Sequence, residues 1–220
     1  MTRKTTNLTA SSALPRRPTS DVRLTDGDRL FAKRLESETV EGLSRQMRKD
    51  ESVARPRYLR SFEGNEEGTE YRISFSRKRD GLKKATETYA TLPAALALDW
   101  VSDPEMLTPA PNPFSRSSST PYYVVWDPFE APDLKPGDEL QYNVSGSCIR
   151  TARGSLDWEA GDDVLELTGS LSSVSSSDGR ASCPLLVQLT LSRTGSLDSR
   201  YRGGRVIARQ VREIELDSVP

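Results

Sequence analysis

In several runs between residue 71 and the end of the chain, hydrophobic residues recur at every second position, and this alternation constrains the fold more than any other feature of the sequence. Tyr71, Ile73 and Phe75, for example, alternate with polar residues. A period of two is typical of strands with one buried face. Turn-forming dipeptides that contain glycine separate the runs. Further runs of strand character are Lys84–Thr91, Tyr122–Trp126, Glu139–Thr151, Val164–Val174, Leu185–Leu191 and Arg205–Leu216.

These runs predict a mainly β body over residues 61–220. About eight antiparallel strands with a turn every ~10–20 residues are typical of a β-sandwich or a jelly roll. The segment 102–121 contains five prolines and a serine-rich run, which predicts a long loop. A loop of this length on a compact domain is usually functional or disordered.

The first sixty residues have a different pattern. Residues 1–24 are rich in Thr, Ser and Pro and hold few core-forming residues, which predicts a disordered basic arm. Over residues 25–60, apolar residues recur at multiples of four, and this spacing predicts an amphipathic helix followed by a linker. The residues that carry this spacing are Phe31, Leu35, Leu43 and Met47.

Charge is divided unevenly along the chain. Residues 1–60 contain 14 Lys/Arg and 8 Asp/Glu, a net charge of +6, whereas the remaining residues contain 17 and 24, a net charge of −7. The first twenty residues have four basic and no acidic side chains. A basic arm on an acidic body indicates a polyanionic partner. The alternative is a solvated tail that keeps the protein soluble.

Two groups of basic residues are candidates for phosphate contacts. One lies in the arm, where flexible cations neutralise phosphates without fixed geometry. The other surrounds the predicted turn Asp80-Gly81, where a charged hairpin that resists edge-to-edge pairing is the alternative interpretation. Aromatic residues do not interleave with either group in the sequence, so no base-stacking surface is predicted. The predicted nucleic-acid-binding residues are Arg3, Lys4, Arg16, Arg17, Arg72, Arg77, Lys78, Arg79, Lys83 and Lys84.

Histidine is absent from the sequence, which removes His-dependent triads, His-ligated zinc and the commonest general base. No phosphate-binding glycine motif occurs. Adjacent acids such as Asp138 and Glu139 are typical of solvated turns. Cys148 and Cys183 are too few for a disulfide scaffold and are predicted to be buried thiols. We therefore predict no enzymatic activity, no cofactor and no metal site.

No membrane partner is predicted. The longest apolar stretches are far shorter than the ~20 residues that a helix needs to cross a bilayer. The basic N-terminus has no apolar segment behind it, so it does not match a secretory signal.

The layout of the chain resembles the coat proteins of small positive-strand RNA viruses. The resemblance rests on a short Ser/Thr/Pro/Arg arm, a basic linker segment, and a β body with a long inter-strand loop over residues 102–121. It implies a jelly-roll body that packs into a shell while the arm faces the RNA. The arm residues that it assigns to RNA contact are Arg3, Lys4, Arg16, Arg17 and Arg23.

The sequence therefore predicts a viral capsid subunit that self-assembles into a homo-oligomeric shell and packages single-stranded RNA by charge. Its predicted location is the virion, and the host cytoplasm during assembly. A non-structural viral accessory protein that binds RNA or a host protein is the main alternative. A phage or bacterial structural module without RNA contact is another. A further alternative is a carboxylate-based hydrolase that uses Asp127, Asp138, Asp162 or Asp163.

Overall fold

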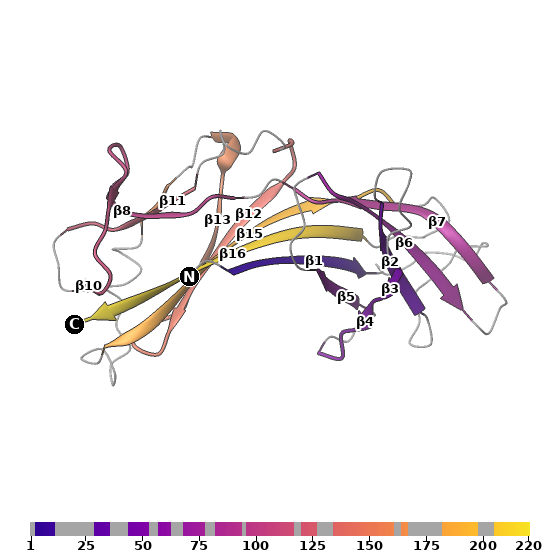
Figure 1. Cartoon of the computed structure of the whole chain (residues 1–220), viewed down its shortest axis with the longest axis horizontal. Coiled ribbons are helices and arrows are strands. Elements are labelled where there is room, and N and C mark those ends of the chain that lie inside the picture. The colour runs from indigo at the N-terminus through magenta and orange to yellow at the C-terminus, as the bar shows by residue number, and fades with distance from the viewer. Residues whose placement is uncertain are drawn as a thin grey trace. The chain divides into compact units, whose positions relative to one another are not determined.

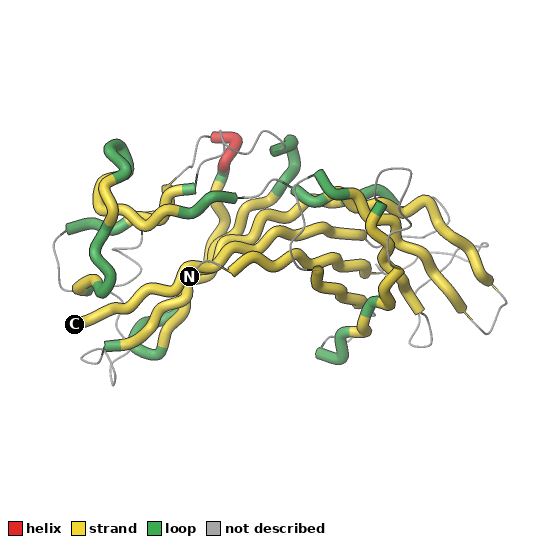
Figure 2. The backbone as a smooth tube through the Cα atoms, in the orientation of Figure 1, coloured by secondary structure: helices red, strands yellow, loops and turns green. Residues whose placement is uncertain are grey.

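The computed structural model consists mainly of β-strands (Figure 2). It describes residues 3–11, 29–35, 44–52, 57–62, 68–77, 82–93, 96–116, 120–126, 134–160, 164–166, 182–197 and 205–220. Within these ranges the helical content is a single 3-10 turn, Trp158–Ala160. No helix in the described ranges is long and apolar enough to span a membrane. The predicted β class is thus confirmed.

The strands of the described ranges form three sheets, and most of these strands are labelled in Figure 1. The eight-stranded sheet has the order β13 (Ala152–Leu156), β12 (Glu139–Gly146), β15 (Cys183–Thr194), β16 (Arg205–Val219), β1 (Arg3–Ser11), β5 (Arg57–Phe62) and β4 (Arg48–Lys49), with β10 (Phe114–Ser115) parallel to β16. A second sheet has the order β14 (Val164–Glu166), β11 (Tyr123–Val125), β8 (Asp99–Asp103) and β9 (Thr108–Pro109). The third, which we call the hairpin sheet, has the order β3 (Ser44–Gln46), β2 (Arg29–Arg34), β6 (Glu70–Arg77) and β7 (Leu82–Thr91).

The chain divides into two compact units, each built from separate stretches of sequence. Unit 1 comprises residues 1–4, 94–191 and 211–220, and unit 2 comprises residues 5–93 and 192–210. This division differs from the predicted segments 1–24, 25–60 and 61–220. The residue ranges of β15 and β16 extend over both units.

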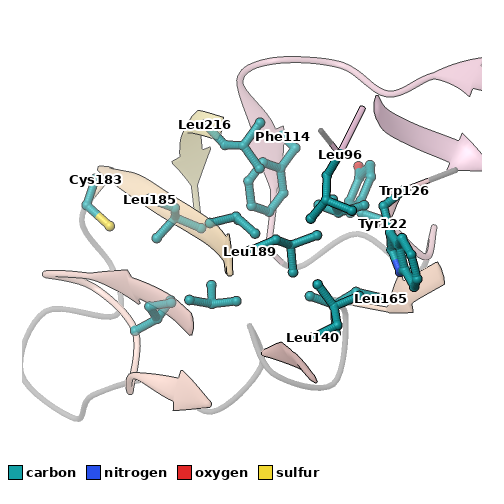
Figure 3. Close-up of a cluster of buried hydrophobic side chains, with 14 of the residues drawn as sticks. Leu96, Phe114, Tyr122, Trp126, Leu140, Leu165, Cys183, Leu185, Leu189 and Leu216 are labelled. Atoms are coloured by element: carbon teal, nitrogen blue, oxygen red, sulfur yellow. The ribbon is translucent and has the colours of Figure 1, made fainter. Parts of the chain in front are cut away.

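The core of unit 1 is a cluster of aliphatic and aromatic side chains (Figure 3). It takes members from the β14-β11-β8-β9 sheet, such as Val124, and from the eight-stranded sheet, such as Leu140 and Leu189. In β15 every second residue from Cys183 to Leu191 is buried, as the alternating pattern predicts. Trp100 and Tyr122 stack with ring centroids 5.4 Å apart.

The core of unit 2 lies between the hairpin sheet and residues of the eight-stranded sheet. Leu30 and Ala32 of β2 and Tyr71 and Ile73 of β6 contribute one side of it. The members from the other sheet are Tyr58, Val206 and Ala208. Tyr71 is completely buried, because its side chain lies on the face of β6 that packs into the core of unit 2.

The predicted pairing of the two strands on either side of Asp80-Gly81 is confirmed, whereas the turn itself lies outside the described residues. β6 and β7 pair antiparallel from Glu70–Thr91 to Arg77–Leu82, with a register shift between Ile73 and Phe75. The runs predicted near residues 122, 139, 185 and 205 also form strands. The predicted loop 102–121 is partly wrong, since β9 and β10 lie within it.

The predicted amphipathic helix over residues 25–60 is wrong for the described part of this segment, which forms β2, β3, β4 and β5. The four-residue spacing of apolar side chains was compatible with a helix. The structure instead uses the two-residue alternation of Leu30 and Ala32, because β2 pairs with β6 and buries that face. Tertiary pairing here overrides the local helical pattern.

The predicted disorder of the N-terminal arm is wrong for Arg3–Ser11. These residues form β1, which pairs antiparallel with β5 from Thr6–Phe62 to Ser11–Arg57. Threonine is common in strands because β-branched side chains suit the pleated backbone, and three threonines lie in β1. Residues 12–28 lie outside the described residues.

The prediction that both cysteines are thiols is also wrong. Cys148 and Cys183 form a disulfide with Cα atoms 5.9 Å apart, and both residues are buried. Cys148 follows β12, and Cys183 begins β15, its neighbour in the sheet. This adjacency in the sheet brings together two cysteines that are 35 residues apart in sequence.

Candidate nucleic-acid interface

The hairpin sheet has one apolar face and one polar face. Along β2 and β6, the buried residues Leu30, Ala32, Tyr71 and Ile73 alternate with half-buried or exposed residues. Successive side chains of a strand point to opposite faces, so the intervening residues share the second face. We call this the outer face of the hairpin sheet. Its described members in β2 and β6 include Arg29, Phe31, Lys33, Arg72 and Ser74.

The strand register places two of these residues in one row across the sheet with Tyr89 of β7. Lys33 of β2 is directly opposite Arg72 of β6, and Arg72 is opposite Tyr89 of β7. Neighbouring strands lie about 4.8 Å apart, so the row from Lys33 to Tyr89 spans roughly 10 Å. The next row of the outer face consists of Gln46, Phe31 and Ser74.

The pair of cations in this row is electrostatically unfavourable in the isolated chain. Like charges directly opposite on neighbouring strands destabilise a sheet by about 0.2–1 kcal/mol. Lys33 and Arg72 are half-buried, and neither has an ion pair with another residue of the described part of the chain. Arg29 adds a third, exposed cation on this face, and Glu70 lies beyond Arg72 as an exposed acid. This part of the face therefore has a net positive charge that an anion would relieve.

Two aromatic rings lie on the same face as these cations. Phe31 is two residues from Lys33 in β2, and Tyr89 is opposite Arg72. Both rings are half-buried, and neither is part of the buried cluster of unit 2. The sequence prediction missed this arrangement, because Phe31 lies far before the basic run at 72–84 in the sequence and Tyr89 follows that run rather than interleaving with it. The two-residue spacing of Phe31 and Lys33 was the available signal.

The backbone of Tyr89 is held from outside the hairpin sheet. Its N–H donates to the Ser196 carbonyl at 3.0 Å, and the Ser196 N–H donates to the Tyr89 carbonyl at 2.9 Å. Gly195 makes this close approach possible, since a Cβ atom at that position would lie 2.1 Å from the Tyr89 carbonyl oxygen. The position of Tyr89 in the row is thus fixed by packing as well as by pairing with β6.

The predicted binding residues fall into three groups in the structure. Arg72 lies on the outer face, and the backbones of Arg77, Lys83 and Lys84 lie in the β6–β7 hairpin, where Lys83 is opposite Ser76. The backbones of Arg3 and Lys4 begin β1. Outside the described residues lie Arg16, Arg17, Arg23, Lys78 and Arg79. The structure adds Arg29 and Lys33, which the prediction had assigned to a helix.

A second cationic surface is the hollow lined by β4 and β5, where Arg48, Lys49 and Arg60 lie. Here the charges are partly compensated. Lys49 forms an ion pair with Glu51 at 3.7 Å. Asp50, which also lines the hollow, forms an ion pair with Arg57. This hollow is therefore a weaker candidate for anion binding than the row of Lys33 and Arg72.

Of the acids proposed for hydrolysis, the structure describes only Asp138. Asp138 accepts a hydrogen bond from the Lys135 N–H at 3.0 Å, and its carbonyl accepts one from the Trp158 indole at 2.9 Å. It lines an acidic cleft with Glu139, Asp157 and Glu159. Among the described residues no group of His, Cys, Asp or Glu is arranged to hold a metal ion. Asp127, Asp162 and Asp163 lie outside the described residues.

Arg212 is a buried cation whose side chain binds the backbone. Its side chain is 7% exposed, and its Nε donates to the Leu96 carbonyl at 2.8 Å. Burial lowers the pKa of the guanidinium group from its usual value. An arginine remains protonated under ordinary conditions, so we interpret this residue as a fixed donor that anchors residue 96.

No model of a known protein family matches the chain, and no curated protein is similar to it.

Proposed function

We propose that this protein is a structural, non-enzymatic viral coat subunit that self-assembles into a shell and packages single-stranded RNA through phosphate contacts that do not read sequence. The proposal locates the protein in the virion, and in the host cytoplasm during assembly. It includes an antiparallel sandwich or jelly roll as the shell-forming body. Buried clusters that draw members from two sheets support this last part.

The observation that carries the proposal is the cross-strand pair of Lys33 and Arg72. Two cations opposite one another weaken a sheet, so their placement favours a role in which an anion lies between them. Phosphate is the anion that Lys and Arg commonly bind, Lys as a point charge and Arg as a bidentate donor. The basic hairpin β6–β7 extends the positive charge along the same sheet.

The disulfide supports the virion location in this proposal. Disulfides persist in oxidising surroundings, which include the surfaces of virions, and are rare in cytosolic proteins. A buried cystine between Cys148 and Cys183 is compatible with a shell protein whose mature form lies outside the cell.

The test is RNA affinity measured at several salt concentrations for the wild-type chain and for Lys33→Gln and Arg72→Gln. Each lost phosphate contact should reduce the slope of log K against log salt by about 0.7 on a single strand. Each substitution should also leave the fold as stable as before or stabilise it by about 0.2–1 kcal/mol, because the repulsion is removed. Arg150→Gln, an exposed arginine of unit 1, is the matched control and should change neither quantity.

Electron microscopy of the purified protein with and without RNA tests the assembly part. Particles that form with RNA and dissociate in high salt support a coat subunit. A discrete dimer that binds RNA would favour the accessory-protein alternative and overturn the shell. A chain that stays monomeric and shows no affinity for RNA at any salt concentration would overturn the whole proposal.

A further inference from the structure

The outer face of the hairpin sheet has aromatic rings beside its cations. Phosphate binding by the cations alone does not account for these rings. Phe31 and Lys33 are two residues apart on β2, and Tyr89 of β7 is opposite Arg72 of β6. Phe31 is therefore the neighbour of Lys33 along β2. Tyr89 is the neighbour of Arg72 across the sheet, on the side away from Lys33. From strand spacing, the two rings lie roughly 12 Å apart along a diagonal of the face.

The neighbours of the two rings are small or polar. Phe31 stands between Gln46 and Ser74 in its row. Serine is small and covers little of an adjacent ring. An aromatic side chain placed among polar residues on this face gains less from burial than the same ring placed in the core. Both rings are half-buried rather than enclosed.

We infer that the outer face binds unpaired nucleotides, with bases stacked on Phe31 and Tyr89 and the phosphates between them held by Lys33 and Arg72. This inference rests on the RNA binding proposed above and adds the mode of recognition. Aromatic stacking tolerates any base, because every base has a π face, so it supplies affinity without reading sequence. A four-stranded sheet with exposed aromatic residues is a known way to bind single-stranded RNA.

Base stacking predicts a preference among nucleic acids that phosphate contacts alone do not predict. In a duplex the bases are stacked inside and cannot reach rings on a protein surface, so the face should prefer a single strand. An abasic strand has the same phosphates but nothing to stack. Affinity should therefore be highest for a twelve-nucleotide oligo(U), and lower for an abasic strand and for a duplex of the same length.

Substitutions of the rings provide the direct test. Phe31→Leu and Tyr89→Leu should each weaken binding of oligo(U) by about 5- to 150-fold, the usual effect of removing one stacked ring. The same substitutions should leave binding of the abasic strand and the salt slope unchanged, because the cations remain. Phe31→Tyr and Tyr89→Phe keep a ring and should restore the affinity. Tyr123→Leu, a half-buried tyrosine in β11 of unit 1, is the matched control.

The outcomes separate this inference from the proposed function. If the leucine variants are folded, as judged by circular dichroism and thermal melting, and bind oligo(U) as well as the wild type does, stacking is overturned while phosphate binding stands. Equal affinity for oligo(U) and the abasic strand overturns stacking in the same way. If none of the three ligands binds at any salt concentration, the proposed RNA binding itself has failed.

Discussion

At the scale of single residues, opposite charges and like charges have clearly different roles in unit 2. Asp50 accepts hydrogen bonds from the N–H and hydroxyl of Ser52 and from the Arg57 guanidinium, which closes the turn after β4. Lys33 and Arg72 stand opposite one another without such compensation among the described residues. The hydrogen bonds to Asp50 stabilise a turn, whereas the placement of Lys33 opposite Arg72 is explained better by anion binding than by folding.

The pH dependence of the Asp50 turn is a prediction at this scale. The bonds from Ser52, and then the one from Arg57, lower the pKa of Asp50 to about 2. A carboxyl group whose pKa is lower in the folded state stabilises the fold fully above its unfolded pKa of about 3.9, and this contribution is lost as the pH falls through the folded value. Wild type should therefore be more stable than Asp50→Asn at pH 7, and the difference should shrink between about pH 4 and pH 2.

Urea denaturation of both proteins at pH 7, 4 and 2.5 measures this difference. Glu51→Gln, an exposed acid beside Asp50, is the control and should show a much smaller effect. A gap between wild type and Asp50→Asn that stays constant down to pH 2.5 would contradict the assignment of the low pKa to this turn.

At the scale of elements, pairing between distant strands decided the structure more often than local pattern did. The hairpin β6–β7 was predictable, because its turn and its two alternating strands are contiguous in sequence. The strand β2 was not, because its partner β6 lies about forty residues away and Phe31, Leu35, Leu43 and Met47 also fit a helix. The disulfide was missed for a related reason: its cysteines lie near each other only once β12 and β15 are neighbours.

The disulfide carries a prediction at the element scale. A cross-link over a separation of 35 residues restricts the unfolded chain and typically adds about 3–4 kcal/mol of stability. For a chain of this size, loss of the stability that the cross-link adds corresponds to a fall in Tm of roughly 10 °C. We expect the double variant Cys148→Ser, Cys183→Ser to melt at about this lower temperature in thermal circular dichroism.

A reducing agent provides the control for this prediction. Dithiothreitol in denaturing and refolding cycles should lower the Tm of the wild type toward that of the double variant and leave the double variant unchanged. The prediction is wrong if the wild type and the double variant melt together under oxidising conditions.

At the scale of the whole molecule, the two units are not separate stretches of the chain. Residues of β15 and β16 belong to both units and contribute to both cores, Leu189 to the core of unit 1 and Val206 to that of unit 2. A chain cut before β15 therefore loses core residues from each unit.

This arrangement predicts that a fragment of residues 1–181 does not fold cooperatively. It lacks the buried strands β15 and β16 entirely, and loss of even one large core side chain typically destabilises a domain by 2–5 kcal/mol. Thermal circular dichroism and proteolysis should show no cooperative transition in the fragment, whereas the full chain should show one. A sharp transition in the fragment near the Tm of the full chain would refute the prediction.

The candidate interface shows what the sequence by itself determined and what it left open. The period-two alternation determined the β class, the hairpin β6–β7 and the basic residues of that hairpin, because alternation and turn chemistry are local properties of the backbone. Arg72 could be identified as a candidate in this way.

The tertiary structure alone decided which residues stand beside Arg72. The sequence contains no signal for the register that puts Lys33 and Tyr89 on either side of it. The two-residue spacing of Phe31 and Lys33 places the half-buried Phe31 ring on the same face only once β2 is known to be a strand. Register depends on which faces of distant strands are buried together, and a shift by one residue would turn every side chain of β2 to the other face. The basic residues were therefore predictable one by one, whereas their combination with aromatic rings required the folded sheet.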